Sequence, residues 1–266
     1  MKSINNIDIF QDKIARGQLC IGTSITFTDS TISELVGDAG FDFTWIDMEH
    51  CPIDTKTALL HIMAARGTDA APFIRVPSAD SVSIKPILEL HPAAIIVPMV
   101  KSSNEVECVV SACKYPPKGS RGFGPRRGRL FGGQSYPEYL KDADEQIMVI
   151  VQIEHVDAVN SIEEILSIEG LDGICVGFND LAGSVGLSGQ INHPDVRKMA
   201  ENVIKSALDY QKLAGLAMGF DLEMIAHYRE LGIQWISVGG DFNLLYSKLR
   251  DVVSETRSVC NKATEK

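Results

Sequence analysis

Short apolar runs rich in β-forming residues alternate along the chain with longer segments whose apolar residues recur at helical spacing. The runs are apolar at nearly every position, which is typical of parallel strands buried on both faces of a sheet. Eight such runs occur, at Leu19–Thr23, Phe43–Asp47, Ala71–Val76, Ala94–Val97, Met148–Ile153, Gly173–Gly177, Leu216–Met218 and Trp235–Val238. The pattern therefore predicts an α/β fold built from repeated strand–helix units.

Eight strand–helix units in 266 residues predict a closed (β/α)8 TIM barrel that occupies residues 1–266 as a single domain. An open, doubly wound sheet is the competing architecture. The first strand–helix turn, Gly22-Thr23-Ser24, lacks the GxGxxG pattern of dinucleotide-binding sheets, which favours the barrel. One long irregular segment, Lys114–Gln134, is rich in Gly, Pro and Arg, as functional or disordered loops often are.

The chain is acidic, with 25 basic and 35 acidic residues and a net charge of −10. This balance argues against nucleic acid as the main partner, but a local basic pocket can still bind a small anion. No apolar run approaches the ~20 residues of a membrane span, so we expect no membrane partner. The six cysteines form no CxxC pair and no signal core opens the chain, so we expect reduced thiols and a cytoplasmic protein.

Ionisable residues follow the second and third apolar runs, where the working face of a barrel lies. Asp47, Glu49 and His50 stand within four residues, and Arg75 lies near the end of the third run. A buried arginine needs an anionic partner, and its planar guanidinium suits a carboxylate. A substrate carboxylate and a structural ion pair within the barrel both remain open as that partner.

Further polar residues follow the fifth and sixth runs. Gln152 lies near the end of the fifth run and Glu154 directly follows it, and Asn179 and Asp180 come just after the sixth. The two carboxylates come from neighbouring strand ends, so they can face one cleft. They could form an acid/base pair, ligate Mg²⁺ or Mn²⁺, or belong to a structural salt-bridge network.

In order and content, these motifs resemble those of the metal-dependent (class II) pyruvate aldolase family of 4-hydroxy-2-oxoheptanedioate aldolase and 2-dehydro-3-deoxyglucarate aldolase. The matching segments are Ala39–Asp42, Ile46–His50, Arg75–Pro77, Val97–Val100, Tyr115–Gly119, Arg121–Gly124, Val151–Glu154 and Asp180-Leu181. The resemblance implies a barrel of the phosphoenolpyruvate/pyruvate type. It also implies a carbon–carbon lyase that cleaves 4-hydroxy-2-oxo acids to pyruvate and an aldehyde through a metal-stabilised enolate.

The resemblance also implies roles for individual residues. Glu154 and Asp180 would ligate Mg²⁺, Mn²⁺ or Co²⁺. Arg75 would hold the 2-oxo acid and stabilise its enolate. His50 would act as acid and base, oriented by Glu89, at a position where the family is expected to carry aspartate.

Two further roles in the resemblance concern water and the substrate carboxylate. Gln152 and Glu49 would position water molecules of the metal's coordination shell, and Gln152 would also contact substrate. The backbone at Asn179 and Asp180 would meet the substrate carboxylate. Members of the family are expected to be homohexamers, trimers of dimers, that exchange their C-terminal helices.

Two departures from the family pattern bear on substrate preference. Phe178 follows Gly177 where the family usually has proline, and Ser24 stands where some members carry a bulky aromatic residue. Other functions also remain open: an oxaloacetate decarboxylase, a citrate-forming synthase of siderophore pathways, or a catalytically retired barrel that binds or assembles. A Schiff-base route would need a lysine at a strand end, and Lys101 is the nearest candidate.

Overall fold

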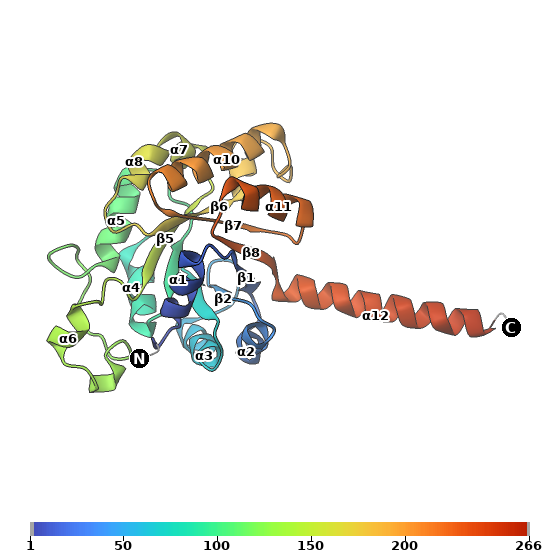
Figure 1. Ribbon diagram of the computed structural model, residues 1–266, viewed down its shortest axis with the longest axis horizontal. Coiled ribbons are helices and arrows are strands. Elements are labelled where there is room, and N and C mark those ends of the chain that lie inside the picture. The colour runs from blue at the N-terminus through green and yellow to red at the C-terminus, as the bar shows by residue number, and fades with distance from the viewer. Residues whose placement is uncertain (1–2, 265–266) are drawn as a thin grey trace.

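The structure, a computed structural model, describes residues 3–264 and contains a closed barrel of parallel strands that pair in chain order from β1 to β8 (Figure 1). The strands are β1 (Cys20–Ile25), β2 (Phe43–Asp47), β3 (Ala71–Arg75), β4 (Ala94–Val97), β5 (Met148–Ile153), β6 (Gly173–Gly177), β7 (Leu213–Met218) and β8 (Trp235–Gly240). All eight predicted runs are strands, so the predicted (β/α)8 barrel is confirmed. The open sheet is excluded because β8 pairs with β1.

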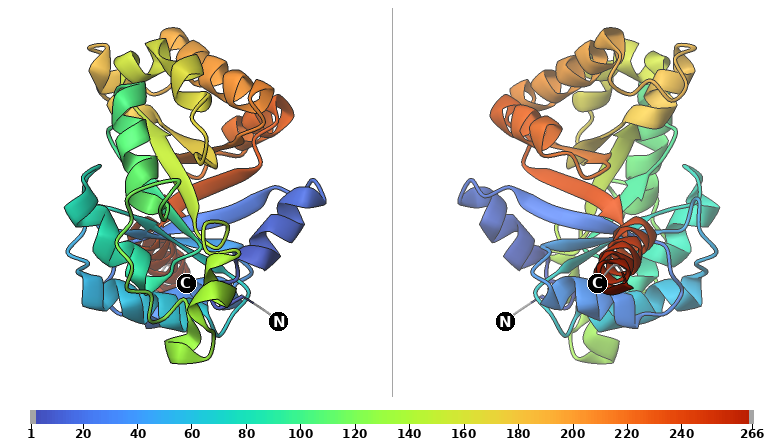
Figure 2. Two further views of the ribbon diagram at one scale, coloured as in Figure 1. Left: turned by 90° about the vertical axis from the view of Figure 1, so that its left-hand side faces the viewer. Right: turned by 90° about the vertical axis from the view of Figure 1, so that its right-hand side faces the viewer.

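Helices surround the barrel (Figure 2). They are α1 (Ile7–Ala15), α2 (Thr31–Asp38), α3 (Thr55–Ala65), α4 (Ser81–Leu90), α5 (Ser103–Cys113), η1 (Leu130–Gly132), α6 (Tyr136–Leu140), α7 (Val156–Asn160), α8 (Ile162–Leu166), α9 (Phe178–Ser184), α10 (Pro194–Asp209), α11 (Leu222–Leu231) and α12 (Asp241–Thr264). None of the helices within residues 3–264 is long and apolar enough to cross a membrane.

The interior of the barrel is filled by side chains that alternate with outward-facing ones along each strand. Phe43 and Phe73 stack with their ring centroids 4.8 Å apart, and both rings lie edge-on to Trp235. Glycine makes room for these rings, because a Cβ at Gly22 would lie 2.3 Å from the Phe43 ring. The middle of the barrel is therefore a packed core, and chemistry must take place at one of its ends.

The N-terminal segment, which the hydrophobic pattern did not predict as a helix, covers one end of this core. Phe10 of α1 is buried, and its ring centroid lies 5.0 Å from that of Phe73. The Asn5 side-chain amide donates hydrogen bonds to the carbonyl oxygens of Pro92 and Gln146, each at 2.8 Å. The end where the strands begin is thereby closed, which leaves the carboxyl ends of the strands as the open face.

The last helix, α12, projects away from the barrel instead of packing along it (Figure 1). Asp241, its first residue, anchors it to the barrel by accepting hydrogen bonds from the backbone N–H groups of Thr26 and Phe27 at 2.8 and 3.0 Å. Beyond this anchor the helix exposes several large apolar residues, namely Phe242, Leu244, Leu245, Tyr246, Leu249, Val252, Val253 and Val259.

Candidate active site

Asp47 and Arg75 occupy paired positions on neighbouring strands, β2 and β3, and form a two-pronged ion pair. Arg75 donates from Nε to Asp47 Oδ1 at 3.0 Å and from Nη2 to Oδ2 at 2.7 Å. Burial favours a higher pKa for the Asp47 carboxyl, but the hydrogen bond and charge of Arg75 outweigh burial and hold that pKa below its usual value. Asp47 is therefore a charged anchor that fixes the arginine.

Arg75 is held from two further directions. Its Nη1 lies 3.0 Å from Glu49 Oε2, and its guanidinium carbon lies 5.5 Å from the centre of the Trp45 ring. A structural ion pair, one of the two partners left open by the sequence, is thus present. A guanidinium has five N–H donors and these carboxylate contacts use about three of them, so Arg75 retains capacity for a ligand.

Glu154 comes just after β5 and is almost fully buried, at 1% exposure. Its Oε1 accepts a hydrogen bond from the backbone N–H of Met99 at 2.7 Å, and its Oε2 accepts one from the Gln152 side-chain amide. Burial, together with the nearby charges of Asp180 and Glu49, raises the pKa of Glu154 to about 7, against the opposing effects of the Met99 N–H and Arg75. The buried carboxylate of Glu154 thus lies near two other acidic side chains, Asp180 and Glu49.

This arrangement suits a hard divalent cation. Carboxylate oxygens of Glu154 and Asp180 are ligands of the kind that Mg²⁺ and Mn²⁺ prefer, and a cation would relieve the repulsion that raises the pKa of Glu154. The side-chain oxygen Oε1 of Gln152 is buried and has no hydrogen-bond partner among the described residues. Residues 3–264 hold no group of three or more His, Cys, Asp or Glu side chains in ligating proximity, so water or substrate would complete the coordination.

Gly177, at the end of β6, leaves the space that Glu154 and Gln152 occupy. A Cβ at this position would lie 2.6 Å from Glu154 Oε2 and 2.7 Å from Gln152 Nε2. Both distances are far below van der Waals contact, so any side chain here would displace the carboxylate or the amide. The glycine is thus a structural requirement of the carboxylate site.

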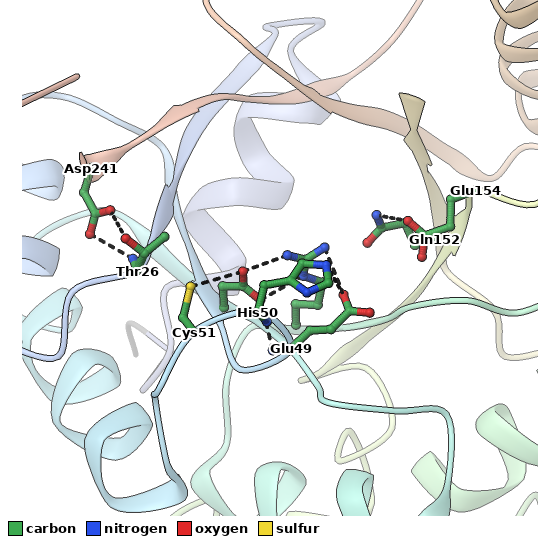
Figure 3. Close-up of polar contacts among 9 residues, drawn as sticks. Thr26, Glu49, His50, Cys51, Gln152, Glu154 and Asp241 are labelled. Atoms are coloured by element: carbon green, nitrogen blue, oxygen red, sulfur yellow. Dashed lines mark hydrogen bonds and ion pairs between the residues drawn. The ribbon is translucent and has the colours of Figure 1, made fainter. Parts of the chain in front are cut away.

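His50 lies beside Glu49 at the open end of the barrel, facing the side from which Gln152 and Glu154 project (Figure 3). Its Nε2 lies 3.6 Å from Glu49 Oε2, and 63% of its side chain is exposed. An exposed imidazole at this position can exchange protons with solvent and with a bound ligand.

Asn179 and Asp180 lie in the first turn of α9, directly after β6, and both are exposed. The charge of Asp180 acts to raise the pKa values of both Glu49 and Glu154. The three carboxylates therefore lie near one another at one end of the barrel. Phe178 is 3% exposed, and its ring centroid lies 5.5 Å from that of Tyr228. This departure from the family pattern is therefore accommodated in the core between α9 and α11.

Glu89 lies apart from the other predicted site residues. It stands near the end of α4, at the end of the barrel where the strands begin, and its Oε1 lies 3.4 Å from Arg121 Nη2. The structure does not bring it to His50 within one chain, because α4 runs antiparallel to the strands. His155, which directly follows Glu154, caps α7, because its Nδ1 accepts a hydrogen bond from the Asp157 backbone N–H at 3.2 Å.

The sequence analysis named Asp47 among the ionisable residues but not as the anchor of Arg75, and it did not single out the Met99 backbone donor or the space at Gly177. The alternation of side chains along a strand indicates the first of these, the contact between Asp47 and Arg75. Asp47 follows the buried Trp45 by two residues, and Arg75 follows the buried Phe73 by two, so each points to the same face as its buried neighbour. The other two depend on the approach of separate strand ends, which has no local sequence signal.

Known proteins similar to this chain share its whole barrel. A 4-hydroxy-2-oxovalerate aldolase of Rhodococcus jostii (strain RHA1) is 39% identical over 245 residues, covering 90% of this chain and 92% of that protein. The crystal structure of an HpcH/HpaI aldolase/citrate lyase family protein from Burkholderia cenocepacia J2315 superposes with a TM-score of 0.87 at 28% identity, covering 94% and 99% of the two chains. The citrate synthase SbnG superposes with a TM-score of 0.86 at 27% identity, covering 94% and 98%.

The family model described as HpcH/HpaI aldolase/citrate lyase matches residues 25–247, which span all the site residues described above. The family predicted from the motifs, and with it a lyase, is thus confirmed. The chain belongs to the HpcH/HpaI aldolase/citrate lyase family.

Proposed function

We propose that the protein is a divalent-metal-dependent aldolase that cleaves 4-hydroxy-2-oxo acids to pyruvate and an aldehyde. The observation that carries this proposal is the placement of Glu154 and Asp180 opposite a fixed Arg75 at the open end of the barrel. Carboxylates that attract a cation, beside an arginine with spare donors, suit a ligand that carries a carboxylate and a keto oxygen.

Glu154 and Asp180 would hold the cation, which we propose to be Mg²⁺, Mn²⁺ or Co²⁺. Such an ion would supply Lewis-acid stabilisation of the negative charge that develops on the keto oxygen. Gln152 and Glu49 lie beside these carboxylates and would orient water there. The hydrogen bond from Gln152 to Glu154 supports this role, since the amide fixes the carboxylate while its own oxygen has no partner among the described residues.

Arg75 would bind the 2-oxo acid through the N–H donors that Asp47 and Glu49 leave free. Because those two carboxylates hold the guanidinium in place, it needs little reorganisation when charge develops on the substrate. The Gln152 side chain would contact the substrate. The backbone N–H groups at Asn179 and Asp180, in the first turn of α9, would meet its carboxylate, as helix N-termini commonly do.

His50 is the side chain best placed to move protons. In cleavage, the 4-hydroxyl loses its proton to a base, the C3–C4 bond breaks, and its electron pair passes to C2 and the keto oxygen as an enolate. The aldehyde leaves, and a proton then returns to C3 to give pyruvate. The exposure of His50 and its contact with Glu49 support its role as this base and acid. Glu89 would be too distant to orient His50 of the same chain.

A second candidate function is carbon–carbon chemistry on oxaloacetate, either decarboxylation or citrate formation. The likeness to the citrate synthase SbnG, over nearly the whole chain, favours keeping this alternative. Incubation with oxaloacetate separates the two forms: pyruvate without an acceptor indicates decarboxylation, and consumption that needs acetyl-CoA indicates a synthase.

We also propose that the protein is a cytoplasmic homohexamer, a trimer of dimers, in which α12 is exchanged between subunits. The apolar residues exposed along α12 support an interface, because a helix with such a stripe gains stability when another surface covers it. Cys20, Cys51, Cys108, Cys113 and Cys175 are free thiols, which fits a reducing compartment.

The direct test of the proposed activity is cleavage of racemic 4-hydroxy-2-oxovalerate by the full chain. Released pyruvate is measured with lactate dehydrogenase, first after treatment with a chelator and then with Mg²⁺, Mn²⁺ or Co²⁺ restored. Pyruvate release that depends on the metal supports the proposal. Release that is unchanged by the chelator contradicts the metal requirement.

A further inference from the structure

One serine ties the helix that carries Asp180 to the turn that follows Glu154. Ser184 is the last residue of α9, and its Oγ accepts a hydrogen bond from the backbone N–H of Val156 at 3.0 Å. Val156 is the first residue of α7 and lies two residues after Glu154. A single hydroxyl group thus connects the two segments that carry the proposed metal ligands.

The hydroxyl of Ser184 is fixed in direction by a second hydrogen bond. It donates its hydrogen to the carbonyl oxygen of Leu181, one turn earlier in α9, at 2.7 Å. Because a hydroxyl has one hydrogen and two lone pairs, this bond leaves the oxygen free to accept from Val156. Ser184 is half-buried, so both bonds are partly shielded from water. The link between the two segments is therefore oriented at both ends.

The N–H of Val156 needs a partner from outside its own helix. The first N–H groups of a helix have no acceptor within the helix, and a capping side chain satisfies only some of them. Here His155 accepts from the N–H of Asp157 at 3.2 Å, and Ser184 accepts from that of Val156. Because Val156 is half-buried, removal of the serine hydroxyl would leave this donor poorly satisfied.

Helical spacing places Asp180 on the face of α9 that makes this link. Asp180 and Ser184 are four residues apart, and residues at that spacing lie on the same side of a helix, one turn apart. That side faces the end of β5, because Ser184 contacts Val156 there. The proximity of Asp180 to Glu154 agrees with this orientation. The bond at Ser184 therefore determines which way Asp180 faces.

We propose that Ser184 is a positioning residue, which holds Asp180 beside Glu154 so that both carboxylates can bind one divalent cation. This inference rests on the proposed function, because it assigns a task to Ser184 only if these two residues are the metal ligands. Ser184 acts through the backbone of α9 and of the turn after β5. Without its hydroxyl, α9 would be free to shift relative to that turn, and the cation would be held less tightly.

The test is Mn²⁺ binding to the full-length protein in its native assembly, measured by electron paramagnetic resonance. We expect Ser184→Ala to weaken binding about tenfold or more, as when a supporting contact of a metal ligand is lost. Ser184→Thr keeps a hydroxyl at the same place and should restore the affinity to near that of wild type.

Ser167→Ala is the matched control. Ser167 directly follows α8 and donates to the carbonyl oxygen of Glu164 at 2.7 Å, the same local bond that Ser184 makes to Leu181. Its segment carries neither of the proposed ligands. Ser167→Ala should therefore leave the affinity for Mn²⁺ unchanged.

A second measurement needs no metal. Amide hydrogen exchange, followed by mass spectrometry on metal-free protein, reports the opening of short segments. In Ser184→Ala we expect faster exchange in residues 155–160 and 178–184, because Val156 loses its acceptor and α9 loses its link to the turn. Ser167→Ala should not change exchange in these residues. Unchanged exchange in Ser184→Ala would show that the serine does not hold the two segments together.

The outcomes separate this inference from the proposed function. Wild-type protein that binds no Mn²⁺ would contradict the proposed function and the inference with it. Wild-type binding that Ser184→Ala leaves intact, or that Ser167→Ala weakens equally, would overturn the inference alone. Equal losses in Ser184→Thr and Ser184→Ala would show that the hydroxyl is not the cause and would also overturn it.

Discussion

Arg75 holds Asp47 across neighbouring strands by two hydrogen bonds, from Nε to Oδ1 at 3.0 Å and from Nη2 to Oδ2 at 2.7 Å. This pair has a consequence for the whole site. Asp47 is 3% exposed, so its charge depends on the arginine, while the arginine depends on Asp47 and Glu49 for its orientation. The proposed catalytic role of Arg75 would thus couple turnover to stability at one residue.

Replacing Arg75 should therefore affect both properties. Arg75→Ala is expected to lower kcat by about 10²–10³, the loss typical of one charge-stabilising donor. It should also lower the free energy of unfolding by about 3–5 kcal/mol, because Asp47 is left buried without a cation. Arg75→Lys keeps the charge and should be markedly less destabilising while still impairing turnover. Steady-state kinetics and urea unfolding measure the two effects, and turnover within a few-fold of wild type would refute the proposed role.

Gly177 offers a test of the carboxylate site that changes no charge. Gly177→Ala places a Cβ 2.6 Å from Glu154 Oε2, so the carboxylate must move. We expect the affinity for Mn²⁺, measured by electron paramagnetic resonance, to fall about tenfold or more, as when a supporting contact of a metal ligand is lost. The matched control is Gly183→Ala in α9, where the nearest atom to the new Cβ lies 3.6 Å away. Equal Mn²⁺ affinity in the two variants would show that Gly177 does not shape the site.

His91 makes the stability of the protein depend on pH. Its pKa is lowered to about 4, by burial first and then by the charges of Arg121 and Arg127. The unfolded chain takes up a proton near pH 6.5 that the folded chain resists until about pH 4, so stability falls as the pH drops through this window. For this group alone the loss between pH 7 and 5 is about 2 kcal/mol.

The variant His91→Asn should remove most of that loss. Asparagine tolerates the left-handed backbone conformation at this position, where φ is 58°. Urea unfolding at pH 7 and pH 5, at one protein concentration, gives the comparison. His193→Asn, at a partly exposed histidine, is the control. If His91→Asn and wild type lose the same free energy of unfolding over this interval, burial of a neutral His91 is not the cause.

The exposed face of α12 predicts a change in assembly. Leu249→Glu combined with Val253→Glu places two charges on neighbouring positions of that face, and we expect the proposed hexamer to dissociate into smaller species. Ser247→Glu combined with Ser254→Glu adds the same charges on about the opposite side of the helix and should preserve the assembly. Light scattering coupled to size-exclusion chromatography gives the masses. An unchanged mass for the Leu249/Val253 variant would argue against α12 as an interface.

The barrel was predictable because its signal is local: each buried strand is a short apolar run, and β2 and β4–β6 have the predicted bounds. The shortest prediction was for β7, which the structure extends from Leu216–Met218 to Leu213–Met218. Lys212, which directly precedes β7, interrupts the apolar pattern. Its side chain donates a hydrogen bond to the carbonyl of Leu171 at 2.8 Å. Helix α1 was not predicted because its role depends on closing the barrel end, a long-range relationship.

The candidate site was only partly predictable for the same reason. His50, Arg75, Gln152, Glu154 and Asp180 stand at strand ends, so strand order alone places them at one end of the barrel. Glu89 was inferred from resemblance, without regard to the direction of α4, and the structure places it near Arg121.

We propose that the site removes a proton from the methyl group of pyruvate with the help of a divalent cation. The most direct test is proton exchange of that methyl group in deuterated water, followed by NMR, after chelation and after Mg²⁺, Mn²⁺ or Co²⁺ is added back. Exchange that stops with the chelator, returns with metal and is lost in Arg75→Ala is the predicted result. If folded protein shows no exchange with any of these metals, enolate formation from pyruvate is contradicted. That result would favour the alternative reaction on oxaloacetate.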